Sequence, residues 1–395
     1  MGARRSWFFL GLSSAACLQW MFLRTLGVHP GPHWAAALPG LCIIGAAFLV
    51  TWAAEAAEMD LPQSLSIGLV ALIAVLPEYA VDIYFAWTAG KNPAYTAYAT
   101  ANMTGANRLL IGVGWPAVLL ACGLKHGKWS IHLTERNALE LVTLLIATLY
   151  AFFLPFKATL SMMDSLVFLA IFGAYGWMSS QAGVEEPELE GTAQWLASLP
   201  KRRRRLTIAT LFIFSATAIF LAAKPFAEGI LAMGRHWGLE EFLLVQWLAP
   251  LASEAPEFIV AIVFAIKGKP AVGMRALISS KVNQWTVLVG MIPLAYALSA
   301  GHLHPMPLDE RQVEEIFLTA AQSLLGIVLL MNLSFTKWEA GSLLILFAAQ
   351  ICFPQAPARY AFAGGHLALS AVLLVTQGYR RNQLRGLVTH VLKSS

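Results

Sequence analysis

Two apolar stretches with a Pro-Glu pair near the middle decide the fold: Ser64-LSIGLVALIAVLPEYAVDIYFAW-Thr88 and Glu241-FLLVQWLAPLASEAPEFIVAIVFAI-Lys267. Each can cross a bilayer as a helix, which takes about 20 apolar residues. A carboxylate at mid-bilayer depth is costly and usually faces a polar path or a partner. The proline of each pair removes a backbone hydrogen bond and frees the carbonyl one turn earlier. The stretches therefore predict broken helices in which Glu78 and Glu257 lie beside free carbonyls, an arrangement that suits a cation.

The composition predicts an all-α polytopic membrane protein. The chain has 395 residues, of which 58% are hydrophobic and only 12% are charged, too apolar a balance for an ordinary soluble protein. Lipid-embedded backbone must satisfy its own hydrogen bonds, so helices are expected throughout. We expect about 12 transmembrane helices, at 6–23, 34–57, 64–89, 95–122, 137–155, 159–179, 206–226, 241–266, 271–298, 313–333, 338–354 and 358–377.

The distribution of charge predicts the orientation. With the N-terminus in the cytoplasm, most of the 27 lysines and arginines fall on the cytoplasmic side, as the positive-inside rule requires. We therefore expect a multi-pass protein of the plasma membrane with both termini cytoplasmic. The segment 180–205 is a cytoplasmic linker that ends in the basic run Lys201–Arg205, interpreted as a topology anchor compatible with contact to anionic membrane lipids. No nucleic-acid partner is indicated, and the oligomeric state is left open.

The linker separates two similar halves. After each Pro-Glu helix comes a short loop and then a helix with small and polar residues, in which Asn107 matches Asn283 and Gly114 matches Gly290. Because the second Pro-Glu helix is the fifth span after the first, an odd offset, the halves must be inverted in the membrane, as in alternating-access carriers. The predicted organisation is an extra N-terminal helix in 1–33, a first repeat in 34–179, the linker, a second repeat in 206–355, and a last helix with a basic tail in 356–395.

On these residues the chain resembles the calcium/cation antiporter superfamily, in particular the membrane domain of sodium/calcium exchangers. The first repeat offers Ala74-Val-Leu-Pro-Glu78 and then Ala101-Asn-Met-Thr-Gly-Ala-Asn107, and the second offers Ala252-Ser-Glu-Ala-Pro-Glu257 and then Ser279-Ser-Lys-Val-Asn-Gln284. The resemblance implies a ten-helix core of two inverted repeats in which Glu78 and Glu257 face each other at a central cation site.

The chain also departs from the family pattern. Ala74 and Val75 replace two hydroxyl ligands of the first repeat, and Glu254 replaces one of the second. Fixed positive charges, Arg108 and Lys281, lie beside the expected ligands and are predicted to compensate carboxylate charge, one of them where relatives hold a transported sodium ion. Because crowded, desolvated acids retain protons at neutral pH, these departures favour exchange of a cation against protons.

The predicted function is a secondary active cation antiporter, not an enzyme, with no catalytic residue and no cofactor. Its cargo is an inorganic cation (calcium, sodium or another) exchanged for protons. The alternatives are a sodium-driven calcium exchanger, or, in another class, a non-transporting membrane scaffold or an intramembrane enzyme. Calcium prefers six to eight oxygen ligands. The predicted metal ligands are Glu78 and Glu257, and the wider cation-binding set adds Asp82, Glu254, Asn102, Asn107, Asn283, Ser253 and Gln284.

Overall fold

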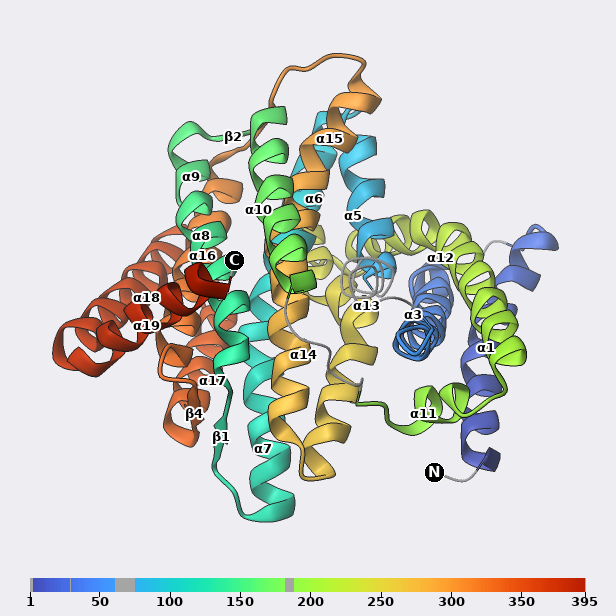
Figure 1. Cartoon of the computed structure of the whole chain (residues 1–395). Coiled ribbons are helices and arrows are strands. Elements are labelled where there is room, and N and C mark those ends of the chain that lie inside the picture. The colour runs from blue at the N-terminus through green and yellow to red at the C-terminus, as the bar shows by residue number, and fades with distance from the viewer. Residues whose placement is uncertain (1–2, 29, 61–74, 182–187, 395) are drawn as a thin grey trace. The chain divides into compact units, whose positions relative to one another are not determined.

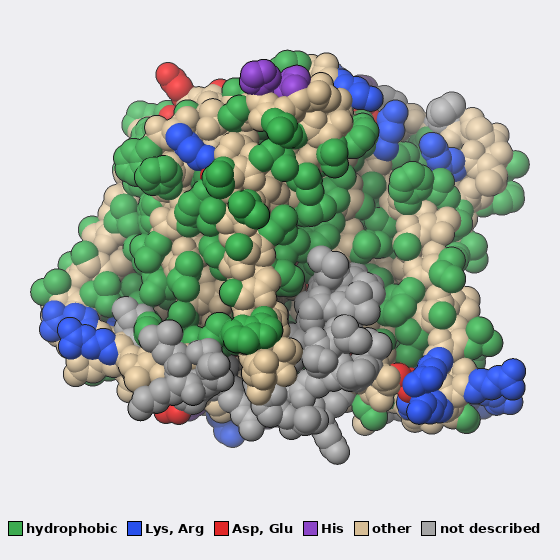
Figure 2. Space-filling model, turned by 45° about the horizontal axis from the view of Figure 1, so that its top comes forward, with side chains coloured by type: hydrophobic (Ala, Val, Ile, Leu, Met, Phe, Trp, Pro, Cys, Tyr) green, Lys and Arg blue, Asp and Glu red, His purple; other side chains and the backbone are tan. Residues whose placement is uncertain are grey.

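Helices account for nearly all of the computed structural model, which describes residues 3–28, 30–60, 75–181 and 188–394 (Figure 1). Within these ranges, nine helices are long and apolar enough to cross a membrane. On the face shown in Figure 2 hydrophobic side chains predominate, and Lys and Arg side chains gather near its edges. Large apolar side chains such as Phe156 and Phe220 are more than four-fifths exposed, which suits a lipid surrounding. The predicted all-helical membrane fold is confirmed.

The chain divides into two units, one of residues 1–85 and 182–257 and the other of residues 86–181 and 258–395. Each unit takes residues from both predicted repeats. In the first unit α3 packs along both α1 and α12, and α11 contacts α3 and α1. This unit contains α1 (Ala3–Thr25), α2 (Pro32–Ala35), α3 (Ala37–Ala57), α11 (Gly191–Ala197) and α12 (Lys201–Trp237), and the first parts of α5 (Leu76–Ala89) and α13 (Glu241–Ile266).

Helix α12 is much longer than the predicted span 206–226. Its 37 residues extend about 55 Å at 1.5 Å per residue, more than the roughly 30 Å of a hydrocarbon core. The basic run Lys201–Arg205 forms its first turns, so the predicted linker contains the start of α12 as well as α11. The helix ends where Gly238 adopts a left-handed φ of 65°, a conformation that glycine adopts without steric cost.

The second unit is built around α16, whose side chains are mostly buried against α6, α8 and α18. It contains η1 (Pro93–Tyr95), α6 (Thr96–Leu109), η2 (Leu110–Gly114), α7 (Trp115–His126), β1 (Ser130–His132), η3 (Glu135–Asn137), α8 (Ala138–Ala151), α9 (Phe153–Lys157), β2 (Thr159–Leu160), α10 (Met162–Gln181), α14 (Pro270–Asn283), η4 (Gln284–Leu288), α15 (Val289–Ala300), β3 (Met306–Pro307), α16 (Glu310–Leu330), β4 (Ser334–Thr336), α17 (Lys337–Cys352), α18 (Ala356–Thr376) and α19 (Gly378–Ser394).

Two short antiparallel ladders join loops of the two halves of the sequence within this unit. β1 pairs with β4, Ile131 lying opposite Phe335, and β2 pairs with β3, Leu160 lying opposite Met306. No sequence pattern indicated these ladders, because each strand has only two or three residues. They connect the first half of the chain to the second at two places.

The Pro-Glu helices differ from the prediction in one respect. α13 runs without interruption from Glu241 to Ile266 and holds Pro250 and Pro256 within it, so the predicted break is wrong for the second repeat. A proline inside a helix removes one hydrogen bond but need not end the helix where packing supports its neighbours. In the first repeat Pro77 lies in the first turn of α5. The predicted span 64–89 extends into 61–74, which lies outside the described residues.

Asp60, just beyond the end of α3, anchors the start of α12. Its carboxylate accepts hydrogen bonds from Arg204, at 2.7 Å from Nε and 3.0 Å from Nη2, and from Nε of Arg205 at 3.2 Å. The hydrogen bonds and charge of these arginines hold the pKa of Asp60 below its ordinary value. The contact ties residues that follow α3 to the first turns of α12.

The Asp60 anchor predicts a pH-dependent stability. The pKa of Asp60 is lower in the folded protein than in the unfolded chain, where it is about 3.9. The carboxylate therefore stabilises the fold at pH values above about 3.9, and this stabilisation is lost as the pH falls through the pKa of the folded state. Asp60→Asn should therefore lower the unfolding temperature at pH 7, and the difference from wild type should shrink below about pH 4. A difference that stays constant over this range would contradict the assignment. Thermal unfolding in detergent at several pH values measures it.

The close approach of α12 to α2 generates a second prediction. A Cβ added at Gly229 would lie 2.2 Å from the backbone oxygen of Ala35, so Gly229→Ala must push the two helices apart. We expect a loss of about 1–3 kcal/mol, as for other overpacked sites. Gly11→Ala in α1 is the matched control, because a Cβ there has no neighbour within 4 Å. Equal unfolding temperatures for the two variants would show that the approach is not tight.

Candidate functional site

In the first unit, the predicted ligands on α5 and α13 are buried acids. Glu78 and Asp82 of α5 are 2% and 1% exposed, Glu254 of α13 is fully buried, and Glu257 is half-buried. Glu78 and Asp82 are one turn apart and share a helix face, as Glu254 and Glu257 do. Charges withdrawn from water in this way must be matched by protons, cations or hydrogen bonds.

Tyr79 connects the acids of the two helices and was not singled out from the sequence. Its hydroxyl lies within electrostatic range of Glu78, Glu257 and Asp82, so acids of both α5 and α13 have Tyr79 as a neighbour. The hydroxyl is buried and has no hydrogen-bond partner in the described part of the chain. A buried phenol group among carboxylates can donate a hydrogen bond to an acid or to a water bound there. Its position directly after Glu78 is the only sequence signal for it.

The hydroxyl of Ser253 is turned toward its own helix. It donates to the backbone oxygens of Ala249 at 3.2 Å and Pro250 at 3.3 Å, a common arrangement for serine inside a helix. Its oxygen keeps lone pairs with which it can coordinate a cation. Across the described residues, no group of three or more His, Cys, Asp or Glu side chains is arranged to hold a metal ion. A calcium ion at Glu78 and Glu257 would therefore need amide, hydroxyl, carbonyl or water oxygens as well.

In the second unit, Lys281 joins the two helices that follow the Pro-Glu helices in sequence. Its ammonium is buried and donates to Asn107 twice, to Oδ1 at 2.7 Å and to the backbone oxygen at 3.1 Å. It also lies 4.5 Å from the centre of the Trp285 ring, where a cation is attracted to the aromatic face. The Asn107 amide nitrogen donates to the backbone oxygen of Met103. Both ends of the Asn107 side chain are thus engaged within the protein.

The matching asparagine is different. Asn283 is buried at 3% exposure, and its Oδ1 has no hydrogen-bond partner among the described residues. Gln284 and Asn102 are also buried, at 0% and 1%. Of the two asparagines that the repeat makes equivalent, only Asn283 therefore presents an uncommitted amide oxygen.

A π-helical turn follows each polar stretch, η2 after α6 and η4 after α14. Such turns shift the side chains that follow and are frequent at functional sites. Gln284 is the first residue of η4. No sequence pattern indicated these turns.

Arg108 pairs with a carboxylate that was not assigned to the site from the sequence. Its Nη2 lies 2.6 Å from Oε2 of Glu315 on α16, and both side chains are about 3% exposed. Gln322 of α16 donates to the backbone oxygen of Arg108 at 3.2 Å. The charge of Arg108 is thus directed toward α16.

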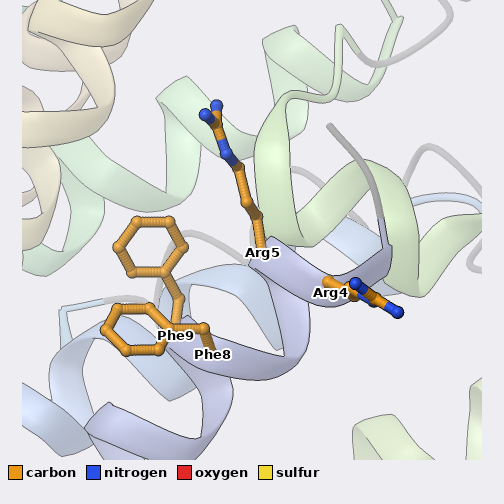
Figure 3. Close-up of a pocket in the computed structure, with 4 residues that line it drawn as sticks. All are labelled: Arg4, Arg5, Phe8 and Phe9. Carbon is orange, nitrogen blue, oxygen red and sulfur yellow. The ribbon is translucent and has the colours of Figure 1, made fainter.

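A surface cavity of about 350 Å³ on α1 contains none of the predicted ligands. It is lined by Arg4, Arg5, Phe8 and Phe9, and Figure 3 shows the two arginines pointing in different directions, away from the two phenyl rings. The cavity offers no converging groups for a cation.

The comparison with known families decides the identity. The family model for the sodium/calcium exchanger protein matches the chain twice, over residues 34–181 and 207–354. The chain belongs to the sodium/calcium exchanger family. The predicted family is therefore confirmed, and so is the predicted function as a cation antiporter of this type. Because the members of this family are exchangers, the alternatives of a non-transporting scaffold and an intramembrane enzyme are disfavoured.

Solved structures of exchangers are similar to this family member. The crystal structure of the H⁺/Ca²⁺ exchanger CAX is 44% identical, with a TM-score of 0.95 over 98% of both chains. YfkE is 15% identical (TM-score 0.60, 91% of this chain and 99% of that chain), and the sodium-calcium exchanger NCX_Mj is 16% identical (TM-score 0.53, 80% and 97%). At these low identities, the similarity to YfkE and to NCX_Mj shows a shared fold and nothing further. No match was found among curated proteins.

The Lys281–Asn107 contact predicts a specific loss of stability. Lys281→Met keeps a long side chain but removes both hydrogen bonds, leaving the Asn107 oxygens without these donors, which costs about 1–3 kcal/mol. Lys125→Met, which removes an exposed lysine on α7, is the control. We expect a clearly lower unfolding temperature in detergent for Lys281→Met only. An unchanged temperature would mean that the contact does not hold α6 and α14 together.

Proposed function

We propose that this family member exchanges calcium for protons across the membrane by alternating access. The observation that carries the proposal is the 44% identity to the H⁺/Ca²⁺ exchanger CAX over nearly the whole of both chains. Burial of several acids on α5 and α13 supports it, because such acids can be neutralised in turn by calcium and by protons.

Protons, rather than sodium, are the proposed coupling ion. Lys281 supports this assignment, since its ammonium takes an amide oxygen and a backbone oxygen of Asn107, which are the kinds of ligand that a sodium ion would use. Arg108 is the weaker candidate for a sodium surrogate because it is paired with Glu315. A sodium-driven calcium exchanger remains the second candidate, supported by the family match.

The proposed cation site contains Glu78 and Glu257 as the acids that bind calcium. Their common proximity to Tyr79 supports the pair. The remaining proposed ligands are Asp82, Ser253, Glu254, Asn102, Asn107, Asn283 and Gln284. Among these, the uncommitted oxygen of Asn283 makes it a stronger candidate than Asn107.

We further propose the two inverted repeats 34–179 and 206–355, separated by the linker 180–205 and flanked by 1–33 and 356–395. The two separate family matches support these boundaries. The proposed setting is the plasma membrane with cytoplasmic termini, supported by the charge distribution. Membrane lipids are the expected surroundings.

The test is transport by purified protein in proteoliposomes that contain a pH dye and a calcium dye. Wild type should couple calcium movement to proton movement, and Glu78→Gln or Glu257→Gln should reduce both fluxes at least a hundredfold, because an amide neither ionises nor exchanges a proton. Glu310→Gln, at the exposed start of α16, is the matched control and should transport normally.

Two results would overturn the proposal. Full activity in either glutamate variant would remove these acids from the site. Calcium uptake driven by a sodium gradient, with no proton movement, would assign the chain to sodium coupling instead.

A further inference from the structure

Glu314 and Glu315 on α16 lie in a buried cluster of charges. Glu315 is paired with Arg108 of α6 at 2.6 Å and lies 3.9 Å from Arg359 of α18. The carboxylate of Glu314 accepts a hydrogen bond from Nε of Arg359 at 2.8 Å. All four residues are less than a tenth exposed. Arg311 of α16 also acts on this cluster electrostatically, so three arginines accompany two glutamates.

One member of the cluster comes from a helix beyond the matched family segments. The second match ends at residue 354, and α18 begins at Ala356. α18 packs closely on α16 through Leu318, Ala321 and Ala363. Arg359 therefore links this helix, through Glu315, to Arg108.

Arg108 directly follows Asn107, so the direction of its charge matters to the ligands proposed on α6. We infer that Glu315 is a positioning residue for the cation site: it directs the Arg108 charge toward α16, and Arg359 holds Glu315 in place. The functional part of this inference rests on the proposed calcium transport. If Glu315 lost its charge, the guanidinium of Arg108 would be free to reorient near the amide oxygens of α6 and repel an incoming cation.

The chain supplies a matched pair of variants. Glu315→Gln removes the partner of Arg108, whereas Glu314→Gln makes the same change one residue earlier, on an acid for which the described contacts show pairing with Arg359 and not with Arg108. Both should lower the unfolding temperature, because each leaves a buried arginine with less compensation. Only Glu315→Gln should raise the calcium KM, on the order of tenfold, with little change in maximal rate.

A second pair tests the role of α18. Arg359→Gln should raise the calcium KM in the same direction as Glu315→Gln. Arg380→Gln is the control, since Arg380 of α19 is also buried but donates to the backbone oxygens of Val328 and Leu329, at the other end of α16, and to the carboxylate of Glu339 on α17. Arg380→Gln should affect stability without changing KM.

Equal KM values for Glu315→Gln and Glu314→Gln, or for Arg359→Gln and Arg380→Gln, would overturn the inference. Failure of the proposed function is distinguishable because wild type would then show no calcium-coupled proton flux. In that case amide hydrogen exchange in α6 decides the positioning role. Faster exchange over Thr96–Leu109 in Glu315→Gln than in Glu314→Gln supports it, and equal exchange in the two variants contradicts it.

Discussion

The hydrogen bonds from Lys281 to Asn107 join the two helices that the repeat makes equivalent. A buried ammonium is tolerated only where its donors are satisfied, and here an amide oxygen, a backbone oxygen and the face of Trp285 satisfy it. This requirement fixes the spacing of α6 and α14 at the residues where ligands are proposed. It also makes the repeats unequal, because the Asn107 oxygen accepts from Lys281 while the Asn283 oxygen has no partner within the part of the chain that the structure describes.

The same rule explains the rest of the second unit. Arg108 cannot be buried alone, and Glu315, Arg359 and Glu314 form a chain of pairs that reaches from α6 across α16 to α18. These contacts explain why α16 is the most enclosed of the candidate spans. Polar layers of this kind restrict how helices can slide past one another, since a displaced charge loses its partner before it gains another.

Sequence patterns predicted the features that depend on neighbouring residues in the chain. Apolar runs located the spans, and the paired Pro-Glu motifs with the Asn and Gly spacing led to the exchanger family. The patterns failed where tertiary packing decides. The helix break expected at Pro256 is absent because α13 continues through it, and α12 exceeds its apolar run at both ends. The partner of Arg108 was missed because Glu315 lies in a distant span near a helix start, where an acid has an ordinary explanation. The π-helical turns had no signal at all.

The two small ladders have a consequence for how the protein is made. β1 and β2 are synthesised with the first half of the chain, but their partners β4 and β3 emerge only with the second. Until β4 and β3 have been synthesised, Ile131 and Leu160 have no partner strand. The edges of β1 and β2 therefore stay unpaired while the first half is still attached to the ribosome. Contacts so far apart in sequence form slowly, because closing the chain between them is entropically unfavourable. Assembly of the second unit is therefore a late event, completed after translation has passed β4.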